Sequence, residues 1–157
     1  MNNKVILGKE DIDLQEFKGK MVYDDTDSLV SYTERAENER KGAEVKSIEI
    51  ESYGSPTRNS MHKVKDMIQK EFEISSIVLI HRVGHFEPCE MIKAVLISAP
   101  EKEVALKALA MTIDMFDSHV PIKKRVSTTD GRDYWVKRAD EVMNLYGQVV
   151  EGIFEEE

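Results

Sequence analysis

Apolar residues along the chain follow the two-residue period of strands in some segments and the longer period of helices in others. Ile48 and Ile50 alternate with polar neighbours, which predicts a strand with one buried face. The runs IVLIH and MIKAVLIS are almost entirely apolar, which predicts buried strands. With two shorter stretches added, the predicted strands cover residues 4–7, 29–33, 45–52, 77–81 and 91–98.

Two long segments carry apolar residues at helical spacing. The first runs from about residue 56 to residue 72, and its apolar residues are Met61, Val64, Ile68 and Phe72. The second follows Pro100, which suits a first helical turn, and its apolar face comprises Val104, Ala105, Ala108, Leu109, Thr112 and Phe116. Shorter helices are predicted over residues 11–18, with Asp11 as the N-cap, and over residues 139–146.

Turn residues separate these elements. The polar run ERAENERKG at residues 34–42 predicts a mobile loop, and residues 84–88 predict a turn. Asp130-Gly131 lies between two strand-like runs. We therefore expect residues 120–128 and 133–136 to form a hairpin.

Length and composition fit a single folded domain. The 157 residues are 41% hydrophobic, which is enough apolar material for a core. Interleaved strands and helices predict an α+β domain over residues 1–157, with a mixed sheet, a C-terminal hairpin subdomain and a frayed acidic tail at residues 150–157. No apolar run is long enough to cross a membrane, the first residues lack a signal-peptide pattern, and Cys89 is the one cysteine. These features predict a cytoplasmic protein.

Acidic residues outnumber basic ones by 30 to 22, which gives a net charge of −8. This balance argues against a nucleic-acid-binding protein, because such proteins neutralise phosphates with basic side chains. Basic residues gather most densely at Lys123, Lys124 and Arg125, a cluster suited to an anionic ligand. The alternative interpretation is a solvated strand edge, where lysine prevents unwanted strand pairing. Composition and periodicity alone predict a fold and no activity.

The order of residues after position 80 adds a more specific signal. The segment HRVGHFEPCE precedes a strand and a helix containing Ile113-Asp114, and then come PIKKR, a turn glycine and YWV. This order resembles the large, catalytic subunit of molybdopterin synthase. The residues in register are His81, Arg82, Gly84, Glu90, Asp114, Pro121, Lys124, Gly131, Trp135 and Val136. Upstream, LVSYTERAENERKG and the strand IEIESY are similar to the family's strand, loop and strand, so the resemblance covers residues 29–138.

The resemblance implies an α/β hammerhead-like fold and a role in molybdenum cofactor biosynthesis. In this family, sulfur passes from the C-terminal thiocarboxylate of a small ubiquitin-like carrier to cyclic pyranopterin monophosphate, which becomes molybdopterin. The expected partners are the carrier and a second copy of the chain, in a heterotetramer built on a central homodimer. The resemblance implies no cofactor, and neither nucleic acid nor membrane is an expected partner.

The resemblance also implies which residues act. Lys124 matches one of the family's two active-site lysines and is the candidate catalytic residue. Fixed cations stabilise the negative charge that develops during sulfur transfer, and they hold a phosphate. The candidate substrate-binding residues are Lys123, Arg125, Arg35, Arg40 and Arg138.

Several positions depart from the family pattern. Asp117 stands in the place of the second family lysine, Pro100-Glu101 in the place of a His-Arg pair, and Glu37 in the place of a loop arginine. Lys123 replaces a tryptophan. A carboxylate beside a phosphate repels it. Two interpretations therefore stay open: a working synthase with a rearranged site, or a catalytically diverged homodimer that binds the carrier or another anionic partner.

A metal site is not expected, although His81 and His85 have Cys89 and Glu90 nearby. These four groups lie on a strand and a turn, where they need not converge. Arg82 is expected to bridge a carboxylate such as Glu90 and so to order the end of the strand. Cys89 is expected to be a small, semi-buried side chain.

Overall fold

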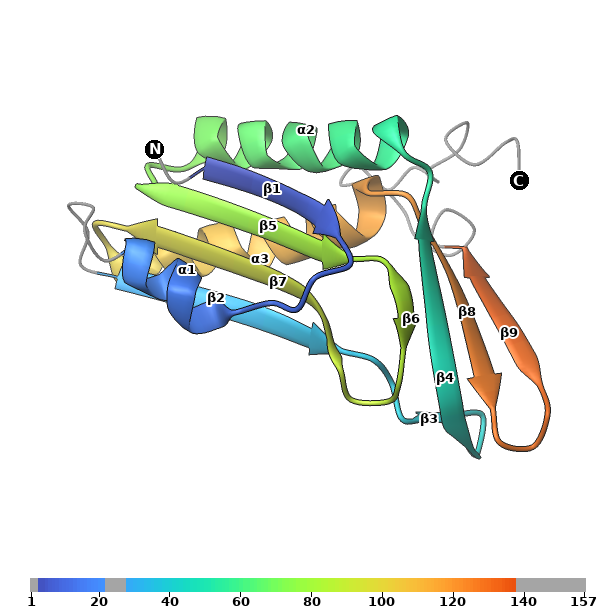
Figure 1. Ribbon diagram of the computed structural model, residues 1–157. Coiled ribbons are helices and arrows are strands. Elements are labelled where there is room, and N and C mark those ends of the chain that lie inside the picture. The colour runs from blue at the N-terminus through green and yellow to red at the C-terminus, as the bar shows by residue number, and fades with distance from the viewer. Residues whose placement is uncertain (1–2, 22–27, 138–157) are drawn as a thin grey trace.

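The computed structural model describes residues 3–21 and 28–137, which form two sheets and three helices (Figure 1). The first sheet has the order β1 (Asn3–Gly8), β5 (Ser76–Arg82), β7 (Met91–Ala99) and β2 (Ser28–Arg35). Strand β1 is parallel to β5, whereas β5–β7 and β7–β2 are antiparallel pairs. The expected mixed sheet is therefore confirmed.

Helices cover both faces of this sheet. Helix α2 (Ser55–Glu71) and helix α3 (Lys102–His119) pack against one face, and α1 (Leu14–Met21) packs against the other. Both long helices were predicted, and most of their expected apolar residues, such as Met61 and Phe116, are buried. Every residue of β5 is buried, which explains its continuous apolar run.

The second sheet lies beside the end of α3 (Figure 1). It has the order β3 (Glu39–Arg40), β4 (Ala43–Ser52), β8 (Ile122–Thr128) and β9 (Asp133–Lys137), and β6 (Gly84–Phe86) pairs with β4. The predicted hairpin is confirmed as β8–β9. Its turn contains Gly131 at φ +88°, a conformation that glycine adopts without strain.

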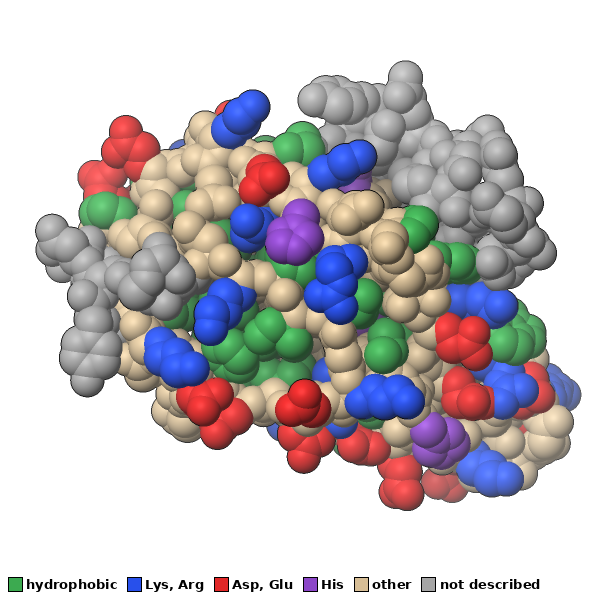
Figure 2. All heavy atoms as spheres, turned by 45° about the horizontal axis from the view of Figure 1, so that its top comes forward, with side chains coloured by type: hydrophobic (Ala, Val, Ile, Leu, Met, Phe, Trp, Pro, Cys, Tyr) green, Lys and Arg blue, Asp and Glu red, His purple; other side chains and the backbone are tan. Residues whose placement is uncertain are grey.

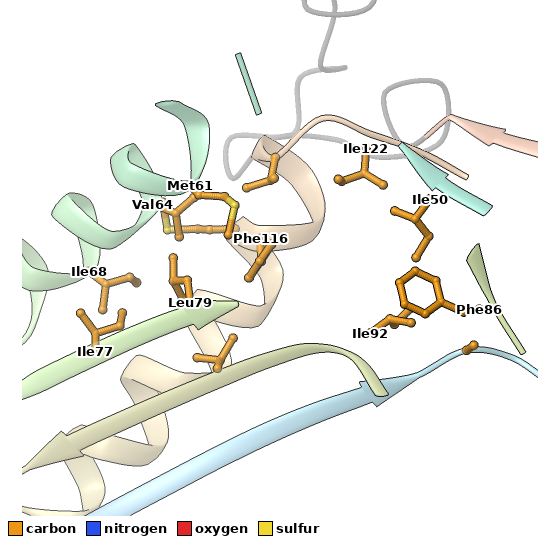
Figure 3. Close-up of a cluster of buried hydrophobic side chains, with 14 of the residues drawn as sticks. Ile50, Met61, Val64, Ile68, Ile77, Leu79, Phe86, Ile92, Phe116 and Ile122 are labelled. Atoms are coloured by element: carbon orange, nitrogen blue, oxygen red, sulfur yellow. The ribbon is translucent and has the colours of Figure 1, made fainter. Parts of the chain in front are cut away.

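One hydrophobic cluster joins the two sheets. Figure 3 shows Leu79 of the first sheet and Phe116 of α3 on one side, and Ile50, Phe86 and Ile122 on the other. All five side chains are at most 2% exposed. The two sheets therefore share a packed core at the C-terminal end of α3, so the position of β8 relative to this helix is fixed.

Two expectations at the N-terminal ends of helices were wrong. Helix α1 begins at Leu14, and the Asp13 carboxylate accepts a hydrogen bond from the Glu16 backbone N–H at 3.2 Å. Asp11, the expected cap, instead pairs with Arg82 at 2.9 Å. Helix α3 begins at Lys102, so Pro100 precedes the helix rather than occupying its first turn.

Two expected loops contain strand residues. The first two residues of the 34–42 segment extend β2, and Glu39 and Arg40 form β3, so this segment is an ordered hairpin. The predicted turn at 84–88 contains β6. The predicted helix at 139–146 and the acidic tail lie outside the described residues.

Candidate functional site

Strand geometry separates the three residues of the basic cluster. On β8, Lys124 lies opposite Ile50 of β4 and Val136 of β9, and the buried residues Ile122 and Val126 share its face. Side chains at successive strand positions point to opposite faces. Lys124 is therefore half-buried on the face of the second sheet that adjoins the core, and its two basic neighbours lie on the other face.

Lys123 and Arg125 gather around an exposed tryptophan on that outer face. The Lys123 ammonium lies 5.1 Å from the Trp135 ring centroid, and the Arg125 guanidinium lies 5.5 Å from it. Arg125 also forms an ion pair with Glu49 of β4. The structure thus groups Lys123 and Arg125 with each other, and it does not bring them together with Lys124.

The two arginines near the 34–42 segment have different surroundings. Arg40 donates to Glu37, with 2.5 Å between Nε and Oε1, and its guanidinium lies 6.0 Å from the Tyr134 ring. Tyr134 pairs with Val126 and is therefore on the same face of the second sheet as Lys124. Arg40 is the candidate cation that the structure brings toward this face. Arg35 is exposed at the end of β2, and Arg138 lies outside the described residues.

A buried lysine that the sequence analysis did not single out lies at the end of α3. The Lys93 ammonium lies 2.8 Å from Asp117 Oδ1 and 3.0 Å from Glu34 Oε1, and its side chain is 1% exposed. It also lies 4.9 Å from the centroid of the Phe116 ring. The Tyr32 hydroxyl donates to Glu34 at 3.1 Å. A lysine inside the apolar run MIKAVLIS was the signal for this site, because a buried ammonium requires a carboxylate partner.

The carboxylates that depart from the family pattern do not form one group within this chain. Glu37 is paired with Arg40, and Asp117 is paired with Lys93. Glu101 lies at the opposite end of α3 from Asp117, and a helix of 18 residues spans about 27 Å. The expected repulsion of an anion is therefore reduced at two of the three positions, because each of those carboxylates already has a cationic partner.

Arg82 orders the end of β5, as predicted. Its guanidinium lies 3.9 Å from the Glu90 carboxylate and 2.9 Å from that of Asp11, and it donates to the carbonyl of Met91 at 2.9 Å. The expectation for Cys89 was wrong: its side chain is exposed, and its φ is +73° in the turn before β7. Residues 3–21 and 28–137 contain no group of three or more His, Cys, Asp or Glu side chains that could hold a metal ion.

The cavity beneath α1 does not provide an anion site. Its volume is about 270 Å³, and Lys124 is not among its lining residues. The lining includes four carboxylates, those of Glu10, Asp11, Asp13 and Glu16, against the single cation of Arg82. Figure 2 shows acidic side chains among the basic ones on the face in view, rather than one continuous basic patch. No helix within the described ranges is long and apolar enough to cross a membrane.

Two relatives that are similar in sequence to this chain carry the same description. The molybdopterin synthase catalytic subunit of Yersinia pestis is 24% identical over 140 residues, which are 88% of this chain and 92% of that protein. The protein with the same description from Dictyostelium discoideum is 32% identical over 117 residues, 73% of this chain and 74% of its own length.

Solved structures show the same fold. Molybdopterin synthase from Staphylococcus aureus superposes with a TM-score of 0.77 at 20% identity, over 83% of this chain and 95% of that one. A chain in the complex of subunits 1 and 2 of molybdopterin-converting factor from Helicobacter pylori superposes with a TM-score of 0.69 at 13% identity, over 96% of this chain and 97% of that chain. These structures confirm the predicted α+β fold class.

The model of the MoaE protein family matches residues 7–117, which are more than half of the chain. This match begins at Leu7 near the end of β1, includes α2 and the segment around Arg82, and ends at Asp117 in the last turn of α3. It confirms the resemblance that the residues after position 80 indicated. The chain belongs to the MoaE family.

Proposed function

We propose that this protein is the catalytic subunit of a molybdopterin synthase and acts in molybdenum cofactor biosynthesis in the cytoplasm. It takes sulfur from a thiocarboxylated ubiquitin-like carrier and transfers it to cyclic pyranopterin monophosphate. Family membership supports the reaction class. The observation that carries the assignment of the site is the place of Lys124, half-buried on the core-side face of β8.

The proposed role of Lys124 follows from the charges in the reaction. The pterin substrate brings a phosphate, and the carrier tail brings a thiocarboxylate. Negative charge develops as the thiocarboxylate sulfur bonds to a pterin carbon and water then cleaves the acyl–sulfur bond, which leaves the carrier with a C-terminal carboxylate. An ammonium group in a site that is partly shielded from solvent stabilises that charge more strongly than it would in water. Its three N–H groups donate hydrogen bonds to anionic oxygen or sulfur.

The proposed assembly is a homodimer with one carrier at each end. The complex of subunits 1 and 2 from Helicobacter pylori supports the pairing with a second kind of subunit, because one of its chains has the same fold. In this arrangement the carrier tail approaches the second sheet on the face of Lys124. Arg40 and Lys41 both lie over Tyr134 on the same face. Because Arg40 is paired with Glu37, Lys41 is the candidate to supply further positive charge there.

A reconstituted sulfur-transfer assay tests this proposal. Purified protein, thiocarboxylated carrier and cyclic pyranopterin monophosphate are mixed, and the dithiolene product is counted per subunit beside a known synthase. We expect product from the wild type and a loss of about 10²- to 10³-fold in Lys124→Ala, because that variant removes a fixed cation from developing charge.

The matched control is Lys123→Ala. This variant removes the adjacent lysine from the opposite face of β8, so it is expected to retain activity within about twofold of the wild type. Circular dichroism of both variants establishes that they are folded. Carrier binding without product, in an assay where the known synthase is active, would support instead the catalytically diverged binding module. Full activity of Lys124→Ala would contradict the assignment of the site.

A further inference from the structure

The ion cluster of Lys93, Glu34 and Asp117 has no part in the proposed chemistry. It joins three elements, because Lys93 lies on β7, Glu34 on β2 and Asp117 in the last turn of α3. The Lys93 side chain is 1% exposed, whereas that of Asp117 is 42% exposed and that of Glu34 is 27% exposed. The two carboxylates thus reach the surface, and the ammonium that offsets their charge lies beneath them.

This cluster lies at the junction that leads to Lys124. Helix α3 ends at His119, and β8 begins at Ile122, so only a short connection separates Asp117 from the strand of Lys124. Phe116, whose ring contacts the Lys93 ammonium, belongs to the same buried cluster as Ile122 (Figure 3). The cluster therefore lies close along the chain to the strand that carries Lys124.

We propose that Lys93 is a positioning residue for anion binding at this site, because it neutralises Glu34 and Asp117. This inference rests on the proposed function. The three groups together carry a net charge of −1, and without the ammonium the two carboxylates carry −2. Lys93 thereby lowers the repulsion that the pterin phosphate meets.

A purely structural role makes different predictions. In that case Lys93 ties β7 to α3, and its loss lowers stability while the folded fraction binds substrate as before. In the electrostatic case the affinity for the anion follows the net charge of the cluster. The Michaelis constant for the pterin phosphate and the turnover number, measured separately on folded protein, distinguish the two roles.

One variant makes the net charge of the cluster more negative, and two variants raise it to zero. Lys93→Met leaves −2, and we expect the KM for cyclic pyranopterin monophosphate to rise about tenfold with a much smaller change in kcat. Asp117→Asn leaves Lys93 paired with Glu34 at net zero, so KM is expected to fall. The triple variant Glu34→Gln, Lys93→Met, Asp117→Asn carries no charge, so its KM is expected to fall below the wild-type value, as in Asp117→Asn.

Lys65→Met is the matched control. Lys65 is a largely buried lysine on α2, and it pairs with a single carboxylate, that of Asp66, at 3.3 Å. Its loss is expected to leave KM unchanged. Equilibrium dialysis with cyclic pyranopterin monophosphate measures binding for every variant without turnover. If Lys93→Met does not fold, Asp117→Asn and the triple variant decide the question.

The outcomes separate this inference from the proposed function. A wild-type protein that neither binds the pterin phosphate nor forms product overturns the proposed function, and this inference with it. An active wild type whose KM is unaltered in Asp117→Asn and in the triple variant overturns the role of Lys93 alone. A KM that rises with negative charge and falls when the charge is removed supports it.

Discussion

Two groups of basic side chains in this protein differ in burial and in the partners that they contact. Lys93 lies beneath the surface of the first sheet, 1% exposed, between two carboxylates. Lys123 and Arg125 lie on the outer face of the second sheet around Trp135, which is 51% exposed. Three adjacent basic residues in the sequence are thus divided by strand alternation, whereas one isolated lysine is the centre of an ion cluster. Density of charge along the chain is a poor guide to where charge gathers in the fold.

The largest expected difference between the two groups is in stability. Lys93→Met leaves two carboxylates without their buried cation, and because these carboxylates are partly exposed, the expected cost is about 1.5–3 kcal/mol, less than for a fully buried ion pair. Urea or guanidinium unfolding of wild type and variant measures the free energy of unfolding. The triple variant Glu34→Gln, Lys93→Met, Asp117→Asn is the control, because removing every charge is expected to recover most of the loss. A loss below about 1 kcal/mol in Lys93→Met would show that the cluster is hydrated and contributes little.

The two groups of basic side chains also show which features could be predicted from the sequence and which could not. Strands and long helices were predictable because apolar residues repeat at intervals that only one type of element can bury. The ion pair of Lys93 with Asp117 joins positions 24 residues apart. It depends on how α3 lies across β7, which no local pattern specifies. The division of Lys124 from Lys123 and Arg125 was predictable in principle, since alternation is a local property of any strand.

The N-cap of α1 was predicted incorrectly for the same reason, because it depends on a contact between residues distant in sequence. Asp11 and Asp13 are both acidic residues before an amphipathic segment, and capping preferences do not distinguish them. The structure does, because Arg82 of β5 binds Asp11, and Asp13 is then the residue that caps α1. A partner that is distant in sequence therefore decides which local interaction forms. The single-domain boundary at 1–157 and the role of Arg138 stay predictions, since both depend on residues beyond position 137.

A smaller effect is expected from the exposed group. Arg125 and Glu49 form an ion pair in which the side chains are 35% and 38% exposed, so solvent screens their attraction. With its cation–π contact added, Arg125→Ala is expected to lower the free energy of unfolding by about 1 kcal/mol. Chemical denaturation in low and high salt measures this effect, which should shrink as salt increases. A loss as large as that of Lys93→Met would remove the contrast between the two groups.

The smallest expected effect is a pH dependence in the β8–β9 turn. The Thr128 hydroxyl donates to Asp130 Oδ1 at 2.5 Å, and this hydrogen bond holds the pKa of Asp130 below its ordinary value of 3.8. A lowered pKa in the folded state adds stability above the ordinary value, and that stability is lost as the pH falls through the folded pKa. The stability difference between wild type and Asp130→Asn should therefore shrink as the pH falls below about 4 in denaturant titrations. In a Thr128→Val background, which lacks the donor, the same difference should be nearly independent of pH. A pH-dependent difference that persists in this background would assign the effect to Arg132, whose backbone N–H donates to Asp130 at 3.3 Å.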